Sequence, residues 1–226
     1  MNEPGNLIAR GRAADVFEYG EGLVLRRYRF DFDCEYEARV MRHVADAGLP
    51  VPAIIEASGR DLVMERLDGG TMLADFSKHP WLLRAHARTL AGLFQRLHTI
   101  PTEPWMKRRH PTGDVLVHLD LHPDNVMLTS RGPVVIDWSN AGIGDGDAEV
   151  ADLWLILSSA KVPGSAFDRV LAAIGRSLFV RSFLRSFDRS PVAAALPLAY
   201  DNRSRDPNMS EDELAKMREL VARNAT

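Results

Sequence analysis

The sequence predicts an α+β chain with two parts, a small antiparallel β part that carries one helix and a larger, mainly helical part. Short apolar runs separated by glycine-containing turns fill the N-terminal region, and long amphipathic patterns fill most of the remainder. A glycine-containing segment, Asp68 to Gly70, separates the two patterns. We therefore expect an N-terminal lobe over residues 1–67 and a C-terminal lobe over residues 68–226.

The N-terminal lobe is expected to be a sheet of five antiparallel strands with one helix. Gly20 and Gly22 mark a turn inside a meander of the first three strands, and Gly48 ends the helix that follows them. Apolar residues at helical spacing between Glu37 and Val44 predict that helix. The expected strands are Leu7–Ala9, Val16–Tyr19, Leu23–Leu25, Ile54–Ala57 and Leu62–Glu65.

The C-terminal lobe is expected to be helical, apart from one β-like stretch. Helical periodicity runs through four segments, and Ser210 with Glu213 forms a capping box at the start of the last one. The β-like stretch consists of short apolar strands around the polar loop His118–Asn125. The four helical segments are Leu83–Leu97, Asp147–Ser158, Phe167–Phe187 and the region after Ser210.

Composition narrows the class of protein. The 226 residues are 46% hydrophobic and 26% charged, with 28 basic and 31 acidic residues and a net charge of -3, so we expect no nucleic-acid partner. The longest apolar segments are too short to cross a bilayer, and the N-terminus does not resemble a signal peptide, so we expect a cytoplasmic protein without a membrane partner. Cys34 is the only cysteine and is expected to be unreactive, because Asp33 and Glu35 flank it.

Polar residues that could take part in catalysis or bind a metal ion concentrate in the loop His118–Asn125 and at Asp137. Asp120 lies five residues before Asn125 on a loop that leaves a strand, and Asp137 ends a neighbouring strand. The side-chain oxygens of Asn125 and Asp137 suit a hard cation such as Mg²⁺, which takes further ligands from phosphates. Asp120 then remains free to accept or orient the proton of an attacking hydroxyl group, as phosphoryl transfer to an alcohol requires.

Two other interpretations of this loop stay open. His118, Asp120 and His122 alternate along the chain, which would place them on one face of a strand as the ligands of a metal-dependent hydrolase. Pro123 argues against a continuous strand there. Alternatively, Asp120 and Asn125 only hydrogen-bond the backbone of their own loop, as these residue types commonly do.

The motif His118-x-Asp120-x-x-x-x-Asn125, together with Val135-Ile136-Asp137-Trp138, resembles the catalytic and metal-binding loops of the aminoglycoside phosphotransferase and choline kinase family. The resemblance covers about residues 7–158. It implies a bilobal protein-kinase-like fold. It further implies a small-molecule kinase that uses ATP and Mg²⁺.

The reaction implied by the resemblance is transfer of the γ-phosphoryl group of Mg-ATP to a hydroxyl group of a small molecule. Asp120 would be the catalytic residue, and Asn125 and Asp137 would hold the metal. The acceptor would be aminoglycoside-like, choline-like or another hydroxylated metabolite. The C-terminal residues carry acidic and basic side chains in near balance, so composition does not indicate a site for a cation.

The resemblance also assigns a nucleotide site to the first lobe. Arg26 stands where the family has a lysine that contacts the phosphates, and Glu37 corresponds to the helix glutamate that pairs with it. Main-chain groups of Glu65 and Leu67 would meet the adenine edge, with Met64 behind the base. Because arginine replaces lysine, a nucleotide-binding pseudo-kinase without transfer activity is the main alternative function.

Overall fold

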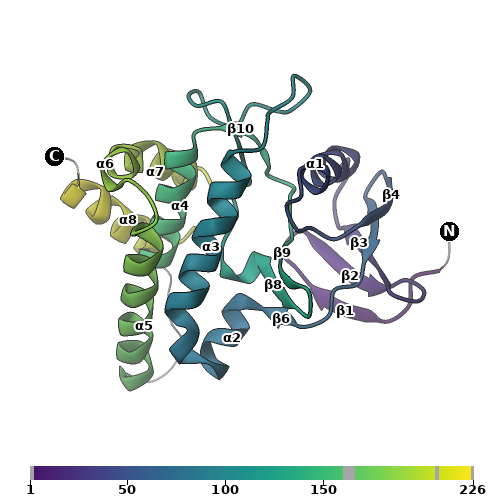
Figure 1. Cartoon of the computed structure of the whole chain (residues 1–226), viewed down its shortest axis with the longest axis horizontal. Helices are drawn as coiled ribbons and strands as arrows, with labels where there is room; N and C mark the ends of the chain where they lie inside the picture. The colour runs from purple at the N-terminus through teal and green to yellow at the C-terminus, as the bar shows by residue number, and fades with distance from the viewer. Residues whose placement is uncertain (1–2, 160–165, 207–208, 225–226) are drawn as a thin grey trace.

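The computed structural model describes residues 3–159, 166–206 and 209–224. It has an α+β fold with two lobes, a sheet with one helix and a group of helices packed beside it (Figure 1). This confirms the expected fold class, whereas the lobe boundary between residues 67 and 68 stays a prediction. Within the described ranges, no helix is both long enough and apolar enough to cross a membrane.

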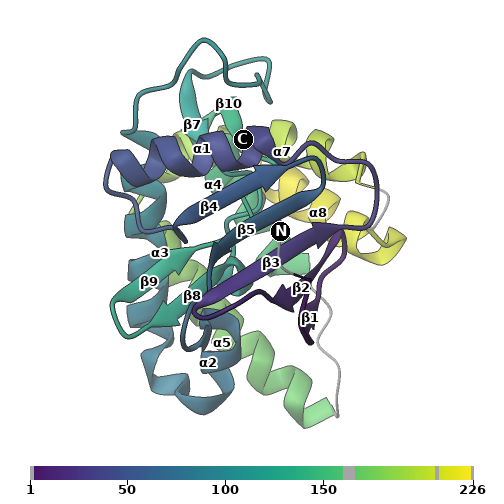
Figure 2. The ribbon, with the colours of Figure 1, turned by 90° about the vertical axis from the view of Figure 1, so that its right-hand side faces the viewer.

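The first lobe, called the β lobe below, is a five-stranded sheet in the order β1-β2-β3-β5-β4, with every neighbouring pair antiparallel. The prediction of five strands and one helix is therefore confirmed. The helix α1 lies alongside β4, with the second lobe behind the sheet (Figure 2). The elements are β1 Leu7–Arg10, β2 Ala14–Glu18, β3 Leu23–Tyr28, α1 Glu35–Asp46, β4 Ile54–Ser58 and β5 Asp61–Glu65.

Helix α1 forms because its apolar residues recur at helical spacing and its ends have suitable partners. Ala38, Met41 and Val44 lie on its buried face. The residue before the helix is Cys34, whose side chain makes no cap, and the Oδ1 atom of Asp33 accepts from the N–H of Glu35 at 3.0 Å. Burial raises the pKa of the Cys34 thiol to about 11, which agrees with an unreactive cysteine.

The second lobe, called the helical lobe below, is built around helices α3 and α4. Helix α3 packs against α5, and α4 packs against α5, α6, α7 and α8. In Figure 1, α3 and α5 run side by side along the front of this lobe. Its helices are α2 Met72–Lys78, η1 Pro80–Leu82, α3 Leu83–His98, α4 Gly146–Ser159, α5 Ala166–Leu184, α6 Arg189–Ala194, α7 Leu196–Ser204 and α8 Glu211–Asn224.

Short strands of the helical lobe flank the polar loop. Strand β7 pairs with β10, and β8 pairs with both β9 and β6. Residues 118–125 leave β7, and residues 136–141 join β9 to β10, so the two segments are brought to the same edge. The elements are β6 Gly70–Thr71, β7 Val115–Val117, η2 Pro123–Asn125, β8 Val126–Thr129, β9 Gly132–Val135 and β10 Gly142–Gly144.

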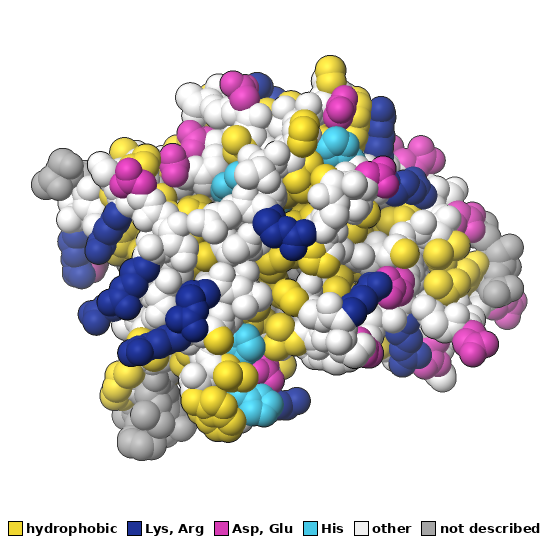
Figure 3. Space-filling model, in the orientation of Figure 1, with side chains coloured by type: hydrophobic (Ala, Val, Ile, Leu, Met, Phe, Trp, Pro, Cys, Tyr) yellow, Lys and Arg dark blue, Asp and Glu magenta, His cyan; other side chains and the backbone are white. Residues whose placement is uncertain are grey.

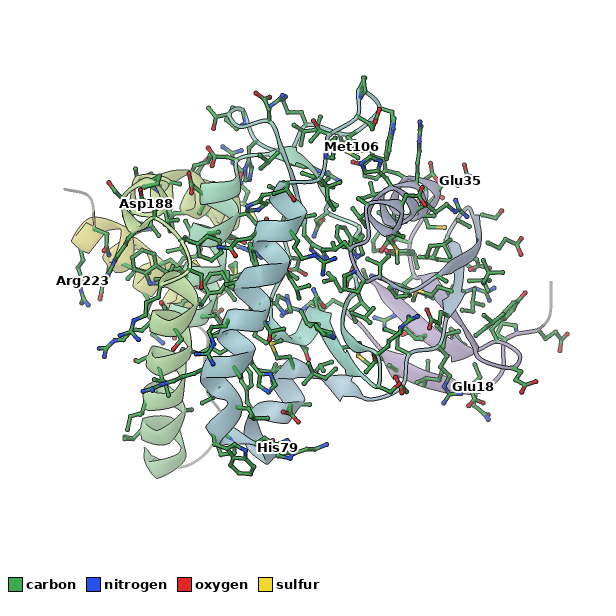
Figure 4. The ribbon with its side chains drawn as sticks, viewed as in Figure 1. Glu18, Glu35, His79, Met106, Asp188 and Arg223 are labelled. Atoms are coloured by element: carbon green, nitrogen blue, oxygen red, sulfur yellow. The ribbon has the colours of Figure 1, made fainter. Side chains whose placement is uncertain are left out.

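Charged side chains of both signs are interspersed over the face shown in Figure 3, with one group of Lys and Arg side chains over the region of α5. The side chains of Glu18 and Glu35 lie on the β lobe, and those of Asp188 and Arg223 lie at the opposite end of the molecule (Figure 4).

Candidate functional site

The polar loop after β7 brings Asp120 and Asn125 together. The Nδ2 group of Asn125 donates to the backbone carbonyl of Asp120 at 2.8 Å and to its Oδ2 atom at 3.2 Å. Leu119 has a φ of 63°, a left-handed conformation that is costly for a leucine. This turn at Leu119 directly precedes the side chain of Asp120.

Asp137 enters the same site from the end of β9. The N–H of Ile136 donates to the carbonyl of Asn125 at 3.0 Å, so Asp137 follows directly after a residue that is bonded to the loop. Asp137 itself has a φ of 68°. The structure thus brings the three sequence-predicted residues Asp120, Asn125 and Asp137 to one place, although it does not test their roles.

Arg26 of β3 and Glu37 of α1 reach this place from the β lobe. An Nη1 atom of Arg26 lies 3.0 Å from Oε1 of Glu37, and Nη2 lies 2.5 Å from Oδ1 of Asp137. Glu37 is fully buried and also accepts from the Tyr28 hydroxyl and from the backbone N–H of Trp138 at 3.0 Å. The predicted pairing of Arg26 with Glu37 is present, and the contact with Asp137 extends it across the lobes.

Burial and neighbouring charges shift the pKa values of the groups in this network in different directions. Burial acts to lower the pKa of Arg26, but Glu37 and Asp137 outweigh it and the pKa is raised. Burial also acts to raise the pKa of Asp137, but Arg26 lowers it below its usual range. For Glu37, burial raises the pKa even though Arg26 and the Tyr28 hydroxyl oppose the shift. The guanidinium is therefore charged and holds Asp137 as a carboxylate.

Glu149 of helix α4 hydrogen-bonds the backbone at the start of the polar loop. Its Oε1 atom accepts from the backbone N–H groups of His118, at 2.5 Å, and Leu119, at 2.7 Å, and its Oε2 lies 2.6 Å from Nε2 of His98. The carboxylate is 2% exposed, so these donors replace water. Glu149 therefore holds the backbone at the strained residue before Asp120.

We expect Glu149→Ala to lower the free energy of unfolding by about 2–5 kcal/mol, because two buried N–H groups lose their acceptor. Burial acts to raise the pKa of Glu149, but His98 and the backbone donors lower it below its unfolded value. The stabilisation is therefore present above the unfolded pKa and is lost as the pH falls through the folded pKa. Urea unfolding across the acid range measures both effects, with Asp147→Asn, an exposed site on the same helix, as the control.

Each of the two histidines of the loop accepts a hydrogen bond through Nδ1 from a backbone N–H group two residues further along the chain. Nε2 of His118 donates to the carbonyl of Ile136 at 3.1 Å, and Nδ1 accepts from the N–H of Asp120 at 3.2 Å. Burial lowers the pKa of His118, so the ring is neutral and both nitrogens are in use. The described residues contain no group of three or more His, Cys, Asp or Glu side chains that could hold a metal ion. The hydrolase interpretation with His118, Asp120 and His122 therefore has no support.

Sequence reasoning missed Arg203 and Asp152. Arg203 of α7 binds Asp152 of α4 through two contacts of 2.6 Å, donates to the carbonyl of Leu119 at 3.3 Å and lies 3.6 Å from Oδ1 of Asp120. Glu149 and Arg203 thus hold the N–H and the carbonyl of Leu119, respectively. A signal existed in the sequence, because Asp152 interrupts an apolar helix three residues after Glu149 and a buried carboxylate there needs a cation.

The remaining predicted residues lie along β5 and the segment after it. Met64 is partly buried in β5, and the N–H of Glu65 donates to the carbonyl of Ala53 at 2.9 Å. The N–H of Glu65 is therefore already bonded within the protein, so a nucleotide base would meet the carbonyl of this residue. Leu67 lies beyond the end of the strand. In the β1–β2 loop, the N–H of Gly11 donates to the carbonyl of Ala14 at 2.9 Å, and a Cβ atom at Gly11 would lie 3.0 Å from that carbonyl.

Several solved structures have a fold similar to that of this chain. An ADP-bound aminoglycoside phosphotransferase APH(2'')-Ib superimposes with a TM-score of 0.63 at 16% identity, covering 97% of this chain and 92% of that one. Aminoglycoside phosphotransferase APH(4)-Ia gives 0.66 at 18% identity, with the same coverage. A streptomycin–ATP complex of APH(2'')-IIa gives 0.63 at 16% identity, covering 89% and 82%. These identities support a shared fold.

Curated relatives match over a short segment. Thiamine kinases of Salmonella paratyphi B and Salmonella newport are 49% identical to this chain over 39 residues, which is 17% of this chain and 14% of each relative. The match therefore spans about one seventh of those proteins. A family model matches much more of the chain, over residues 5–113 and 103–194, and it describes the phosphotransferase enzyme family. The chain belongs to that family, as the resemblance of its His118–Asn125 and Asp137 motifs implied.

Proposed function

We propose that the chain is an ATP-dependent kinase that transfers the γ-phosphoryl group of Mg-ATP to a hydroxyl group of a small molecule. The observation that carries the proposal is the convergence of Asp120, Asn125 and Asp137 with Arg26 at the junction of the lobes. Membership of the phosphotransferase family and the ADP- and ATP-bound structures of similar fold support it.

The donor set fits a magnesium ion. Asp137 is held as a carboxylate, and Asn125 donates through its Nδ2 group, which leaves its Oδ1 atom for a cation. Oxygen ligands of this kind suit Mg²⁺, which would neutralise the charge on the nucleotide phosphates when bound. Arg26, close to Asp137, would contact the same phosphates.

In this proposal the protein supplies position and charge. Asp120 orients the acceptor hydroxyl and accepts its proton as the hydroxyl oxygen attacks the γ-phosphorus atom. The new phosphorus–oxygen bond forms as the bond to the β–γ bridging oxygen breaks, so that ADP leaves. Glu149 and Arg203 fix the backbone that carries Asp120, and Met64, Glu65 and Leu67 would border the adenine.

A pseudo-kinase is the second candidate function, and one observation favours it. Arg26 replaces lysine and is bonded to Asp137 at 2.5 Å, so a metal ion would compete with the guanidinium for that carboxylate. Binding of nucleotide without any formation of ADP in the presence of acceptors would indicate this function.

We expect Mg-ATP to raise the melting temperature of the wild type and to have no such effect on Asp137→Ala. A ligand that binds the folded state stabilises it by about 2.7 kcal/mol at a concentration about 100 times its dissociation constant. Thermal-shift titrations with ATP, with and without Mg²⁺, measure the effect. Asp114→Ala, at an 87% exposed side chain, is the matched control. A shift that persists in Asp137→Ala, or none in the wild type, contradicts the proposed site.

A further inference from the structure

A pocket of about 200 Å³ lies beside the loop that carries Asp120. Leu119, the residue before Asp120, lines one side of it, and Arg203, whose Nη2 atom lies 3.6 Å from Oδ1 of Asp120, lines another. A hydroxyl group bound at this end of the pocket would be close to the carboxylate proposed to receive its proton. The pocket is therefore the candidate acceptor site.

The acidic groups of this pocket already face a cation. Both oxygens of Asp152 bind Arg203 at 2.6 Å, and Oδ2 of Asp206 lies 3.9 Å from Nη1 of the same arginine. The pKa of Arg203 is raised by these carboxylates against the effect of burial, so it stays charged. Asp152 and Asp206 thus serve an internal cation, and they do not form an acidic pocket for a cationic acceptor.

Arg109, by contrast, has no carboxylate partner among the described residues, and its guanidinium lies 5.8 Å from the centre of the Tyr36 ring. It is partly buried and lines the pocket. Its Nε and Nη2 atoms donate to the carbonyls of Ala141 and Ser139, each at 3.2 Å, and it forms no ion pair within the described part of the chain. A partly buried guanidinium without a counter-ion is costly, and an anionic ligand would remove that cost.

His110, the next residue, offers a second unmatched donor. Its ring is 2% exposed and lines the same pocket, and Nδ1 accepts from the N–H of Asp145 at 3.1 Å. Burial lowers its pKa, so the ring is neutral and the proton resides on Nε2. Among the described residues, Nε2 of His110 is the buried side-chain nitrogen or oxygen that lacks a partner. Such a donor normally has an acceptor.

Both side chains pack closely against the glycines of strand β10. A Cβ atom at Gly142 would lie 2.7 Å from Cγ of Arg109, and one at Gly144 would lie 3.1 Å from Nδ1 of His110. The segment that leads to them passes Met106, which lies between α1 and β10 (Figure 4). The guanidinium of Arg109 is held by the carbonyls of Ala141 and Ser139, which lowers the entropic cost of binding.

We propose that the acceptor is a small hydroxylated oxyanion, whose carboxylate or phosphate group is bound by Arg109, beside the ring of His110, while its hydroxyl group points to Asp120. This inference rests on the proposed kinase function and names its substrate class. The size of the pocket agrees with it, because about 200 Å³ is below the range of about 300–1,000 Å³ that is usual for drug-sized ligands. A polycation would have to approach Arg109, and the carboxylates of Asp152 and Asp206 already face Arg203.

The test compares acceptors that share a hydroxyl group and differ in charge. Isothermal titration calorimetry would measure the binding of glycerate, glycerol 3-phosphate, glycerol, choline, thiamine and gentamicin to the full chain, alone and saturated with Mg²⁺ and a non-hydrolysable ATP analogue. Formation of ADP would be followed with ATP. We expect glycerate or glycerol 3-phosphate to bind and to be phosphorylated, and the comparison of these two separates a carboxylate site from a phosphate site.

Arg109→Met should weaken the binding of the anion by about tenfold or more, since a hydrogen-bonded charge is lost. Arg108→Met is the matched control, because Arg108 is exposed and pairs with Asp114. Equal affinities in wild type and Arg109→Met, binding of the cations in preference to the anions, or no binding of either anion would each overturn the inference. Failure of the nucleotide to bind would instead overturn the kinase function, which the thermal-shift titration reports separately.

Discussion

Asp120→Asn should lower the turnover number for phosphoryl transfer by about 10²–10⁴-fold, the usual contribution of a positioned acid or base. The asparagine side chain keeps the shape and the neighbour at Asn125 but cannot take a proton from the acceptor. Because the nucleotide contacts are assigned to Arg26, Asn125 and Asp137, the affinity for ATP should change little. Steady-state kinetics with a coupled assay for ADP, together with a thermal-shift titration, measures the two quantities.

The control is Asp124→Asn, which makes the same change in the same loop at an exposed side chain. It should leave the turnover number within about twofold of the wild type, as surface substitutions usually do. Retention of full turnover in Asp120→Asn would remove this residue from the proposed mechanism. A large loss of ATP affinity would instead move Asp120 into the nucleotide site.

Arg26→Met should be the most destabilising of the substitutions considered, by about 3–5 kcal/mol, because it leaves the buried Glu37 without its cation. It should also depress phosphoryl transfer strongly if Arg26 contacts the phosphates. Urea denaturation measures the first effect and steady-state kinetics the second. Adding Glu37→Gln should restore part of the stability, since the uncompensated charge is removed, but none of the activity.

Arg27→Met is the matched control for this change. Arg27 lies next to Arg26 on β3 and pairs with Asp61 at 2.7 and 2.6 Å. That pair is partly exposed, so its loss should cost only about 1 kcal/mol or less. Equal destabilisation by the two substitutions would contradict the stabilising role assigned to the Arg26–Glu37–Asp137 network. An unchanged turnover number in Arg26→Met would contradict the proposed contact of Arg26 with the phosphates.

Local pattern in the sequence was enough to predict the β lobe and most of the helical lobe. The alternation of apolar runs and glycine turns predicted the five strands, and helical spacing predicted α1, α3 and α4. The capping box also forms, because Oε2 of Glu213 accepts from the N–H and the hydroxyl of Ser210. These features depend on residues close together in the chain, which is why pattern reveals them.

The site was only partly predictable for the same reason. The spacing from Asp120 to Asn125 is local, and the motifs identified Asp137. The contacts that hold them are long-range, because Asp152 and Arg203 are 51 residues apart and Arg26 and Asp137 are 111 residues apart. Spacing cannot indicate which charge on one helix meets which carboxylate on another. The unpaired Nε2 atom of His110 was also hidden, because the lack of a partner among the described residues is visible only once the chain has folded.

The contacts of Glu37 also constrain how the molecule can move. This carboxylate binds Arg26 of the β lobe and the N–H of Trp138 of the helical lobe. Separating the lobes at this point would leave the buried carboxylate of Glu37 and the backbone N–H of Trp138 without hydrogen-bond partners. The two lobes should therefore move relative to each other by rotation about this contact, and they should melt in one cooperative transition.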